Sequence, residues 1–312
     1  MIAFGPIPSR RLGLSLGINN IVSHKVCSYS CLYCQIGNTS KKSMARESFY
    51  EPEKLVAEVE SHLKKLDKKH APDYLTFVAN GEPTLDINLG KEIHLLKTLN
   101  IPIAVITNSS LMNHKHVQDD LMEADWISVK VDAFSEAIWK RINRPLAGIN
   151  YTKILQGLLV FAAVYKGKLN TETMLVKGYN DSSEQLRDNA TFIALLKPQT
   201  AYLSIPTRPP AVKEVKAVPE KQIAEAWQIY QQAGINTELL TGFEGTGAGT
   251  TGNAFEDILN ITAVHPLRDD AMAELLKQEK ADKNVVDSLI SQGLIKASKY
   301  QGKTYYVRSY HF

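Results

Sequence analysis

Short apolar runs and longer amphipathic stretches alternate along the first 240 residues of the chain. Leu55, Val59 and Leu63 recur at helical spacing behind Pro52, which suits a first helical turn, whereas residues 73–79 (DYLTFVA) resemble a buried strand. By these criteria we predict helices over 52–66, 89–99, 114–123, 135–143, 151–166, 183–196 and 219–233, and strands over 20–26, 73–79, 103–106, 126–131, 169–176, 202–205 and 237–240. About six alternations of strand and helix predict βα units and a parallel sheet.

Two features qualify this α/β pattern. Residues 1–19 are rich in Gly, Pro, Ser and Arg, which predicts an ordered loop rather than a strand or helix. Polar and glycine residues follow directly after several predicted strands, where barrel-type α/β proteins carry their functional sites. Six units are too few for a complete eight-stranded barrel.

The pattern changes near residue 242. Residues 242–254 are glycine-rich and predict either a linker or a loop that closes over a site. Helical patterns over 255–264, 269–278 and 282–292 are then followed by two short strands around a turn at Gln301-Gly302. We therefore divide the chain into a partial barrel over 1–241, the glycine-rich segment, and a winged-helix-like domain over 255–312.

The end of the chain is basic and aromatic. Residues 293–312 contain no acid but four basic residues and four tyrosines: Lys296, Lys299, Lys303, Arg308, Tyr300, Tyr305, Tyr306 and Tyr310. This composition fits a nucleic-acid footprint, and it fits a protein-docking or dimer surface equally well.

The amino-acid composition excludes few classes of function. The 312 residues carry a net charge of +3, too little to indicate a nucleic-acid or membrane partner from the total alone. No apolar run approaches the roughly 18–20 residues of a membrane helix, and no basic segment precedes an apolar one at the N-terminus. Three cysteines without an export signal favour a reducing, cytoplasmic location.

All three cysteines fall within eight residues, as Cys27, Cys31 and Cys34 in a C-x3-C-x2-C spacing. Three thiolates can hold three corners of a [4Fe–4S] cluster, which leaves the fourth iron open to a ligand. His24 could complete a Cys3His zinc site, and buried apolar cysteines are a third interpretation. An odd cysteine count argues against a structural disulfide.

The cysteine motif, with aromatic Tyr33 before its last cysteine, resembles the signature of the radical SAM superfamily. That resemblance implies a partial (β/α)6 TIM-like barrel, a [4Fe–4S] cluster and S-adenosylmethionine (SAM) on the open iron. It also implies an external reductant of the ferredoxin or flavodoxin type. One-electron reduction then cleaves SAM, and the resulting 5′-deoxyadenosyl radical abstracts hydrogen from a substrate.

The resemblance extends to the residues that would hold SAM. Asn80-Gly81-Glu82-Pro83 ends a predicted strand and resembles the family's Gly-Gly-Glu-Pro motif, with Asn in place of the first Gly. Thr107-Asn108 ends the next strand and resembles a position that contacts the ribose and carboxylate of SAM. We predict Tyr33 to contact the adenine.

Three ionisable residues are candidates for the chemistry itself. Lys130 and Asp132 share one side of a predicted strand, where they would form either a catalytic site or a buried salt bridge. Arg208 follows a strand end, where it could anchor an anionic substrate or remain a solvated loop charge.

Within the superfamily, the chain most resembles the wyosine-synthetase-like, tRNA-modifying group. That group is known for a second three-cysteine cluster, which a chain with three cysteines in total cannot hold. The sequence thus leaves two substrate classes. The basic end of the chain favours RNA, whereas a single cluster favours a peptide or a glycyl-radical enzyme as the substrate. An iron–sulfur DNA-binding sensor is a non-enzymatic alternative.

Overall fold

The protein is an α/β structure around one curled sheet. The computed structural model describes residues 2–21 and 24–309. The sheet contains eight strands in the order β1-β2-β5-β6-β7-β8-β9-β10. Their bounds are Ala3–Ser9, Gly13–Ile18, Tyr74–Phe77, Ile103–Thr107, Trp126–Lys130, Lys168–Met174, Thr200–Ser204 and Thr237–Leu240. The strands from β2 to β10 pair in parallel, which confirms the predicted α/β class and open barrel.

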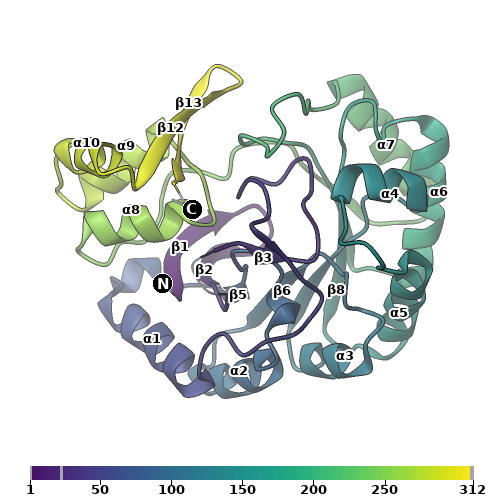
Figure 1. Cartoon of the computed structure of the whole chain (residues 1–312), viewed down its shortest axis with the longest axis horizontal. Helices are drawn as coiled ribbons and strands as arrows, with labels where there is room; N and C mark the ends of the chain where they lie inside the picture. Colours follow the sequence, from purple (N-terminus) through teal and green to yellow (C-terminus); the bar gives the residue numbers. More distant parts are fainter. Residues whose placement is uncertain (1, 22–23, 310–312) are drawn as a thin grey trace.

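Helices cover the outer side of the curled sheet, and the segment that carries β3 (Val26–Cys27) lies on its inner side (Figure 1). They are α1 Pro52–Lys65, α2 Leu89–Leu96, α3 Lys115–Leu121, α4 Glu136–Asn143, α5 Tyr151–Val164, α6 Ser183–Leu196 and α7 Glu220–Gln232. Each falls where the apolar spacing predicts a helix. Strand residues such as Leu75, Ile103 and Ile127 are fully buried beneath them.

The predicted loop over residues 1–19 is wrong, because this stretch forms β1 and β2, an antiparallel pair. β1 contains Pro6 and Pro8, which cannot donate to a ladder and suggest a loop by composition. Proline is tolerated at the edge of a sheet, and β1 is the edge strand. Of the strand predicted over 20–26, residues 22–23 lie outside the described residues, and among the others only Val26 belongs to a strand, the short β3 (Val26–Cys27).

The loop that carries the cysteines is tied to the sheet by short pairings. Val26–Cys27 (β3) pairs in parallel with Lys41–Lys42 (β4), and Val26 also bridges Gly81 at the end of the β5 segment. The cysteine loop is thus held at the carboxyl ends of the parallel strands.

The last sixty residues form three helices and a small antiparallel sheet. The helices are α8 Ala254–Thr262, α9 Asp269–Gln278 and α10 Asn284–Ser291, and the strands are β11 Leu267–Arg268, β12 Ile295–Tyr300 and β13 Lys303–Arg308. Ile258 and Leu275 share a core with Phe4 and Ile7 of β1, so this part packs on the edge strand (Figure 1). None of the helices in the described residues is long and apolar enough to span a membrane.

The glycine-rich segment is docked on its neighbours. Gly249 donates its backbone N–H to the Pro6 carbonyl at 2.6 Å, and Thr251 donates to Asp257 through both its N–H and its hydroxyl. A side chain at 249 would meet Pro6 at 2.4 Å, so this close approach requires glycine.

One buried acid gives a prediction about stability. Glu92 of α2 is fully buried near Asp86, and burial with this neighbouring carboxyl raises the pKa of Glu92. The unfolded chain releases that proton near pH 4.3, so stability falls as the pH rises above this value, by about 1.4 kcal/mol for each pH unit up to the folded pKa. We expect Glu92→Gln to be more stable than wild type in urea unfolding at pH 8, with the difference shrinking toward pH 4.5.

The matched control is Glu58→Gln on the exposed face of α1, which should change stability little at either pH. A Glu92→Gln effect that is independent of pH would contradict the protonated state assigned to Glu92.

Candidate functional site

A cavity of about 330 Å³ lies where the parallel strands end. The cysteine loop and the ends of β6, β7 and β9 line it, together with the β1–β2 turn and part of the last sixty residues. Among the predicted site residues, the cavity lining includes Cys27, Cys31, Cys34, Tyr33, Gly81, Glu82, Thr107, Asn108, Lys130 and Arg208.

Each cysteine sulfur receives a nitrogen donor from a different part of the chain. Asn108 Nδ2 lies 3.3 Å from Cys27 Sγ, and Asn143 Nδ2 lies 3.3 Å from Cys31 Sγ. The Lys25 ammonium donates to Cys34 Sγ at 2.9 Å and to the Gly37 carbonyl at 2.6 Å. Burial raises the pKa of Cys27 to about 11 and that of Cys31 to about 12, so both are thiols when no metal is bound.

Gly81 allows the strand-end motif to approach the cysteine loop. Its φ is +146°, and a Cβ at this position would lie 1.7 Å from the Val26 carbonyl oxygen. The Glu82 N–H donates to that same oxygen at 3.1 Å. Glycine is therefore required for the contact that places Cys27 beside the motif.

Glu82 joins two strand ends. Its buried carboxylate accepts from the Thr84 hydroxyl at 2.7 Å, the Thr107 hydroxyl at 2.6 Å and the Asn108 N–H at 2.7 Å. Burial raises the pKa of Glu82, while these donors act in the opposite direction. The structure thus brings Glu82, Thr107 and Asn108 together beside Cys27.

Two predicted residues do not line the cavity. Asn80 is buried, and its backbone N–H donates to Asn19 Oδ1 at 2.7 Å while its carbonyl accepts from Val26. Asp132 accepts from Asn143 Nδ2 at 2.7 Å, from the Met174 N–H at 2.8 Å and from the Tyr33 hydroxyl. Asp132 therefore orients Tyr33, whose side chain lines the cavity.

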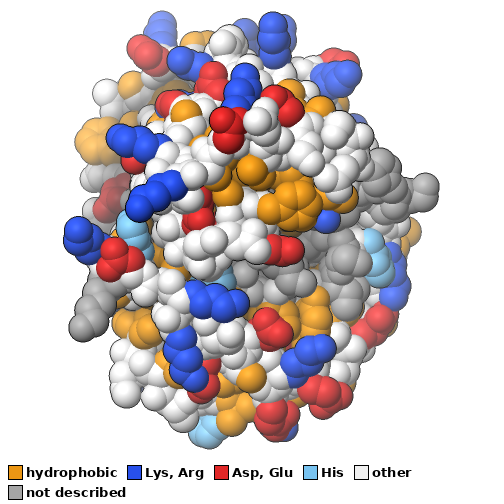
Figure 2. Space-filling model, turned by 90° about the vertical axis from the view of Figure 1, so that its left-hand side faces the viewer, with side chains coloured by type: hydrophobic (Ala, Val, Ile, Leu, Met, Phe, Trp, Pro, Cys, Tyr) orange, Lys and Arg blue, Asp and Glu red, His pale blue; other side chains and the backbone are white. Residues whose placement is uncertain are grey.

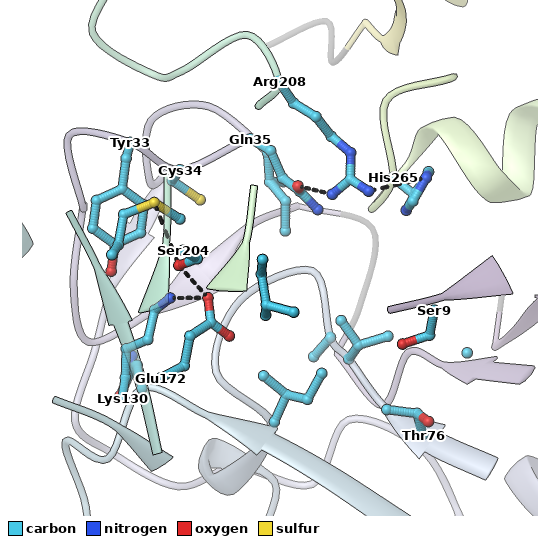
Figure 3. A pocket seen from close by; sticks show the side chains of 18 of the residues that line it. Ser9, Tyr33, Cys34, Gln35, Thr76, Lys130, Glu172, Ser204, Arg208 and His265 are labelled. Atoms are coloured by element: carbon cyan, nitrogen blue, oxygen red, sulfur yellow. Dashed lines mark hydrogen bonds and ion pairs between the residues drawn. The ribbon is translucent and has the colours of Figure 1, made fainter. Parts of the chain in front are cut away.

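Lys130 pairs with Glu172 and not with Asp132. Lys130 Nζ lies 2.6 Å from Glu172 Oε1, and the other oxygen of Glu172 accepts from Arg11. The Ser204 hydroxyl donates to the same carboxylate at 3.0 Å (Figure 3). Glu172 was not predicted as a site residue, although Asn170 and Glu172 fall on the same side of β8 and give that face two polar groups.

Arg208 lies in a second charged group at the cavity rim. It donates to Gln35 Oε1 and to His265 Nε2 at 3.3 Å (Figure 3). It also donates to Glu244 Oε1 at 2.7 Å. The same Glu244 oxygen pairs with Arg10 at 3.0 Å. Glu244 and His265 were also missed, because they come from regions that the sequence divides from the barrel.

Two tyrosines of the C-terminal hairpin, Tyr300 and Tyr305, contact the loop at the cavity rim. The Tyr300 hydroxyl donates to the Pro206 carbonyl at 3.0 Å and the Tyr305 hydroxyl to the Thr207 carbonyl at 3.0 Å. Lys296, Lys299 and Lys303 are exposed, and Tyr310 lies outside the described residues. On the face shown in Figure 2, acidic and basic side chains are interspersed, so this face offers no broad area of one sign.

The donor set fits an iron–sulfur cluster better than a single zinc ion. His24 is exposed, and among the described residues no three His, Cys, Asp or Glu side chains converge on one metal position. Zinc needs four ligands around one ion, whereas the thiolates of a cubane bind separate irons and need not meet at a point. N–H donors to cysteine sulfur are also the contacts that surround such clusters.

Comparisons with known proteins agree with this donor set. The family model of the radical SAM superfamily matches residues 21–190. A UPF0026 protein of Methanocaldococcus jannaschii is 43% identical over 310 residues, which cover 99% of this chain and 96% of the relative.

Two solved structures share the fold. A radical SAM methyltransferase from Sphaerobacter thermophilus is similar with a TM-score of 0.53 at 13% identity, over 73% of this chain and 66% of its own. Streptococcus suis SuiB bound to its precursor peptide SuiA is similar with a TM-score of 0.54 at 13% identity, over 72% of this chain and 48% of its own. From the family model and the close relative, the chain belongs to the radical SAM superfamily of SAM-cleaving enzymes and, within it, to the UPF0026 proteins.

Proposed function

We propose that Cys27, Cys31 and Cys34 hold a single [4Fe–4S] cluster and that SAM binds beside it in the same cavity. The observation that carries this proposal is that all three sulfurs line one cavity with Gly81, Glu82, Thr107 and Asn108, and that each sulfur has its own nitrogen donor. When bound, the cluster and SAM supply an electron and a 5′-deoxyadenosyl radical that abstracts hydrogen from the substrate.

The chain's own residues would position SAM and the substrate and would shield them from water. Glu82 fixes the ends of two strands, so the backbone around Gly81 and Asn108 is rigid where SAM would contact it. Tyr33, held by Asp132 and Asn143, would offer its ring to the adenine. Lys130 and Arg208 lie at the cavity wall, where we assign them to the substrate. Asp132 would act through Tyr33, which it orients, and Asn80 through its backbone bonds to Asn19 and Val26.

We further propose that residues 255–312 form a winged-helix domain beside a barrel of residues 1–241. Three helices followed by an antiparallel hairpin support this proposal. The exposed Lys296, Lys299 and Lys303 make RNA the first substrate class to test, although Tyr300 and Tyr305 are engaged within the chain. A peptide is the alternative substrate. The absence of further cysteines argues against a two-cluster, wyosine-forming reaction.

The test is an anaerobic turnover experiment. Protein reconstituted with iron and sulfide is incubated with SAM and dithionite, and then with reduced flavodoxin or ferredoxin. We expect about four irons per chain and formation of 5′-deoxyadenosine that total tRNA or a peptide extract stimulates. Zinc in place of iron, or a cluster that binds without any SAM cleavage, would overturn the proposal. Cluster-dependent DNA binding would then favour the sensor.

Lys25 gives a separate prediction about the cluster's reduction potential. The Lys25 ammonium is buried and donates to Cys34 Sγ, and a positive charge with a donor to sulfur favours the reduced cluster. We expect Lys25→Met to assemble the cluster but to lower its midpoint potential by tens of millivolts, since a tenfold change in a one-electron equilibrium is about 59 mV.

A redox titration followed by electron paramagnetic resonance measures this shift. Lys41→Met, at an exposed lysine near the same loop, is the matched control and should leave the potential unchanged. Equal potentials for Lys25→Met and wild type would contradict the assigned role.

A further inference from the structure

Two charged groups of the same design line the cavity apart from the cysteines. In each, one carboxylate bridges two cations: Glu172 joins Arg11 to Lys130, and Glu244 joins Arg10 to Arg208. The first group comes from the barrel strands and the β1–β2 turn. The second connects that turn to the loop after β9 through the glycine-rich segment.

The charges in these groups do not balance. Four cations face two carboxylates, and His265 adds no charge of either sign. Burial and the neighbouring Arg208 lower the pKa of His265 well below its usual value, so the ring is neutral at pH 7. The four cations and two carboxylates of these groups therefore sum to a net charge of about +2.

The unbalanced charge is largely removed from water. The side chains of Arg11 and Arg208 are 15% and 14% exposed, and that of Arg10 is 22% exposed. Burial lowers the pKa of Arg10, with Arg208 and Arg11 acting in the same direction. Burying cations in excess of their counterions is costly, unless a bound anion completes the site.

The groups also have hydrogen bonds to give. A guanidinium has five N–H donors. Among the described residues, the Arg11 guanidinium has one hydrogen-bond partner, Glu172, and lies near the Trp126 and Tyr202 rings. Ser9, Ser15 and Thr76 add hydroxyl groups to the same cavity lining. Forked N–H donors beside hydroxyls suit the oxygens of a phosphate or a carboxylate.

We propose that Arg10, Arg11 and Arg208 bind an anionic group of the substrate, a phosphate or a carboxylate, within this cavity. Lys130 adds to the positive field from the β7 end. This inference rests on the proposed function, because only that function makes the bound anion a substrate. It adds that the substrate carries a negative charge at this site. A phosphate would point to a nucleotide or RNA, and a carboxylate to a peptide or amino acid.

The test measures anion binding without reductant, so it is independent of SAM cleavage. Reconstituted protein is titrated anaerobically with inorganic phosphate and, separately, with malonate, at constant ionic strength, and thermal unfolding is followed. We expect a saturable rise in Tm with at least one anion. Arg10→Gln and Arg208→Gln should each raise the apparent Kd at least tenfold, and Arg10→Lys, which keeps the charge, should raise it less.

Arg187→Gln, at an exposed arginine on α6, is the matched control and should bind like wild type. The stronger of the two anions identifies the substrate's charged group. No saturable shift, or equal shifts in wild type, Arg10→Gln and Arg208→Gln, would overturn the proposal.

A final experiment tests whether the arginines bind the substrate anion or the carboxylate of SAM. With SAM present, the anion should still bind with its apparent Kd changed less than threefold. Loss of anion binding upon addition of SAM would assign the arginines to the cofactor and overturn the proposal. Failure of 5′-deoxyadenosine formation would count against the proposed function alone.

Discussion

Cys31→Ala is expected to lose 5′-deoxyadenosine formation to the background level of the assay. Cys31 Sγ lines the cavity and accepts from Asn143, and its loss would leave two thiolates for three irons. Iron and sulfide after anaerobic reconstitution should fall with the activity. Because alanine removes only one sulfur atom from a partly exposed side chain, the metal-free fold should lose about 1 kcal/mol or less.

The matched control is Asn38→Ala, an exposed position in the same loop, which should keep both iron and activity. Circular dichroism and urea unfolding of the metal-free proteins show whether the loop change has spread to the fold. A Cys31→Ala protein that retains a full iron complement and cleaves SAM would show that Cys31 is not a ligand.

Among substitutions that add one methyl group at the site, Gly81→Ala is expected to lower the free energy of unfolding the most. The new Cβ would lie 1.7 Å from the Val26 carbonyl oxygen and 2.7 Å from its carbon, which are backbone atoms that no side-chain rotation can clear. The φ of +146° adds strain of its own. We expect a loss of about 4 kcal/mol or more in the free energy of unfolding, with loss of cluster binding.

Gly148→Ala separates steric overlap from backbone strain. Gly148 has a φ of +89°, and nothing lies within 4 Å of the position that its new methyl group would take, so this change should cost about 1 kcal/mol. Urea unfolding measures both variants. If Gly81→Ala were no less stable than Gly148→Ala, the close contact between Gly81 and Val26 would not be needed for the fold.

The spacing of apolar residues predicted those helices and strands whose buried faces follow the regular period of a helix or a strand. Helices such as α1 and α6 and strands such as β6 and β7 carry their own signals in residue spacing, so their places could be predicted without the structure. The first two strands could not, because Pro6 and Pro8 mimic a loop and only an edge position makes them compatible with a strand.

The grouping of the candidate site residues was predictable where it depends on local motifs. The cysteines, Gly81-Glu82 and Thr107-Asn108 line one cavity, as strand ends of a parallel sheet should. The partner of Lys130 was not predictable, because Glu172 is 42 residues away and reaches Lys130 through the register of β7 against β8. Glu244 and His265 depend on how distant segments pack, which residue spacing does not encode.

The core shared by β1 and the last sixty residues has a consequence for the order of events during synthesis. Phe4 and Ile7 leave the ribosome well before their core partners Ile258 and Leu275. Gln35, one residue after Cys34, likewise donates to the Val264 carbonyl at 2.8 Å. Until residues 258–275 have emerged, the nascent chain lacks this packing and the part of the cavity wall at His265, which would leave an interval for delivery of the proposed cluster to the cysteine loop.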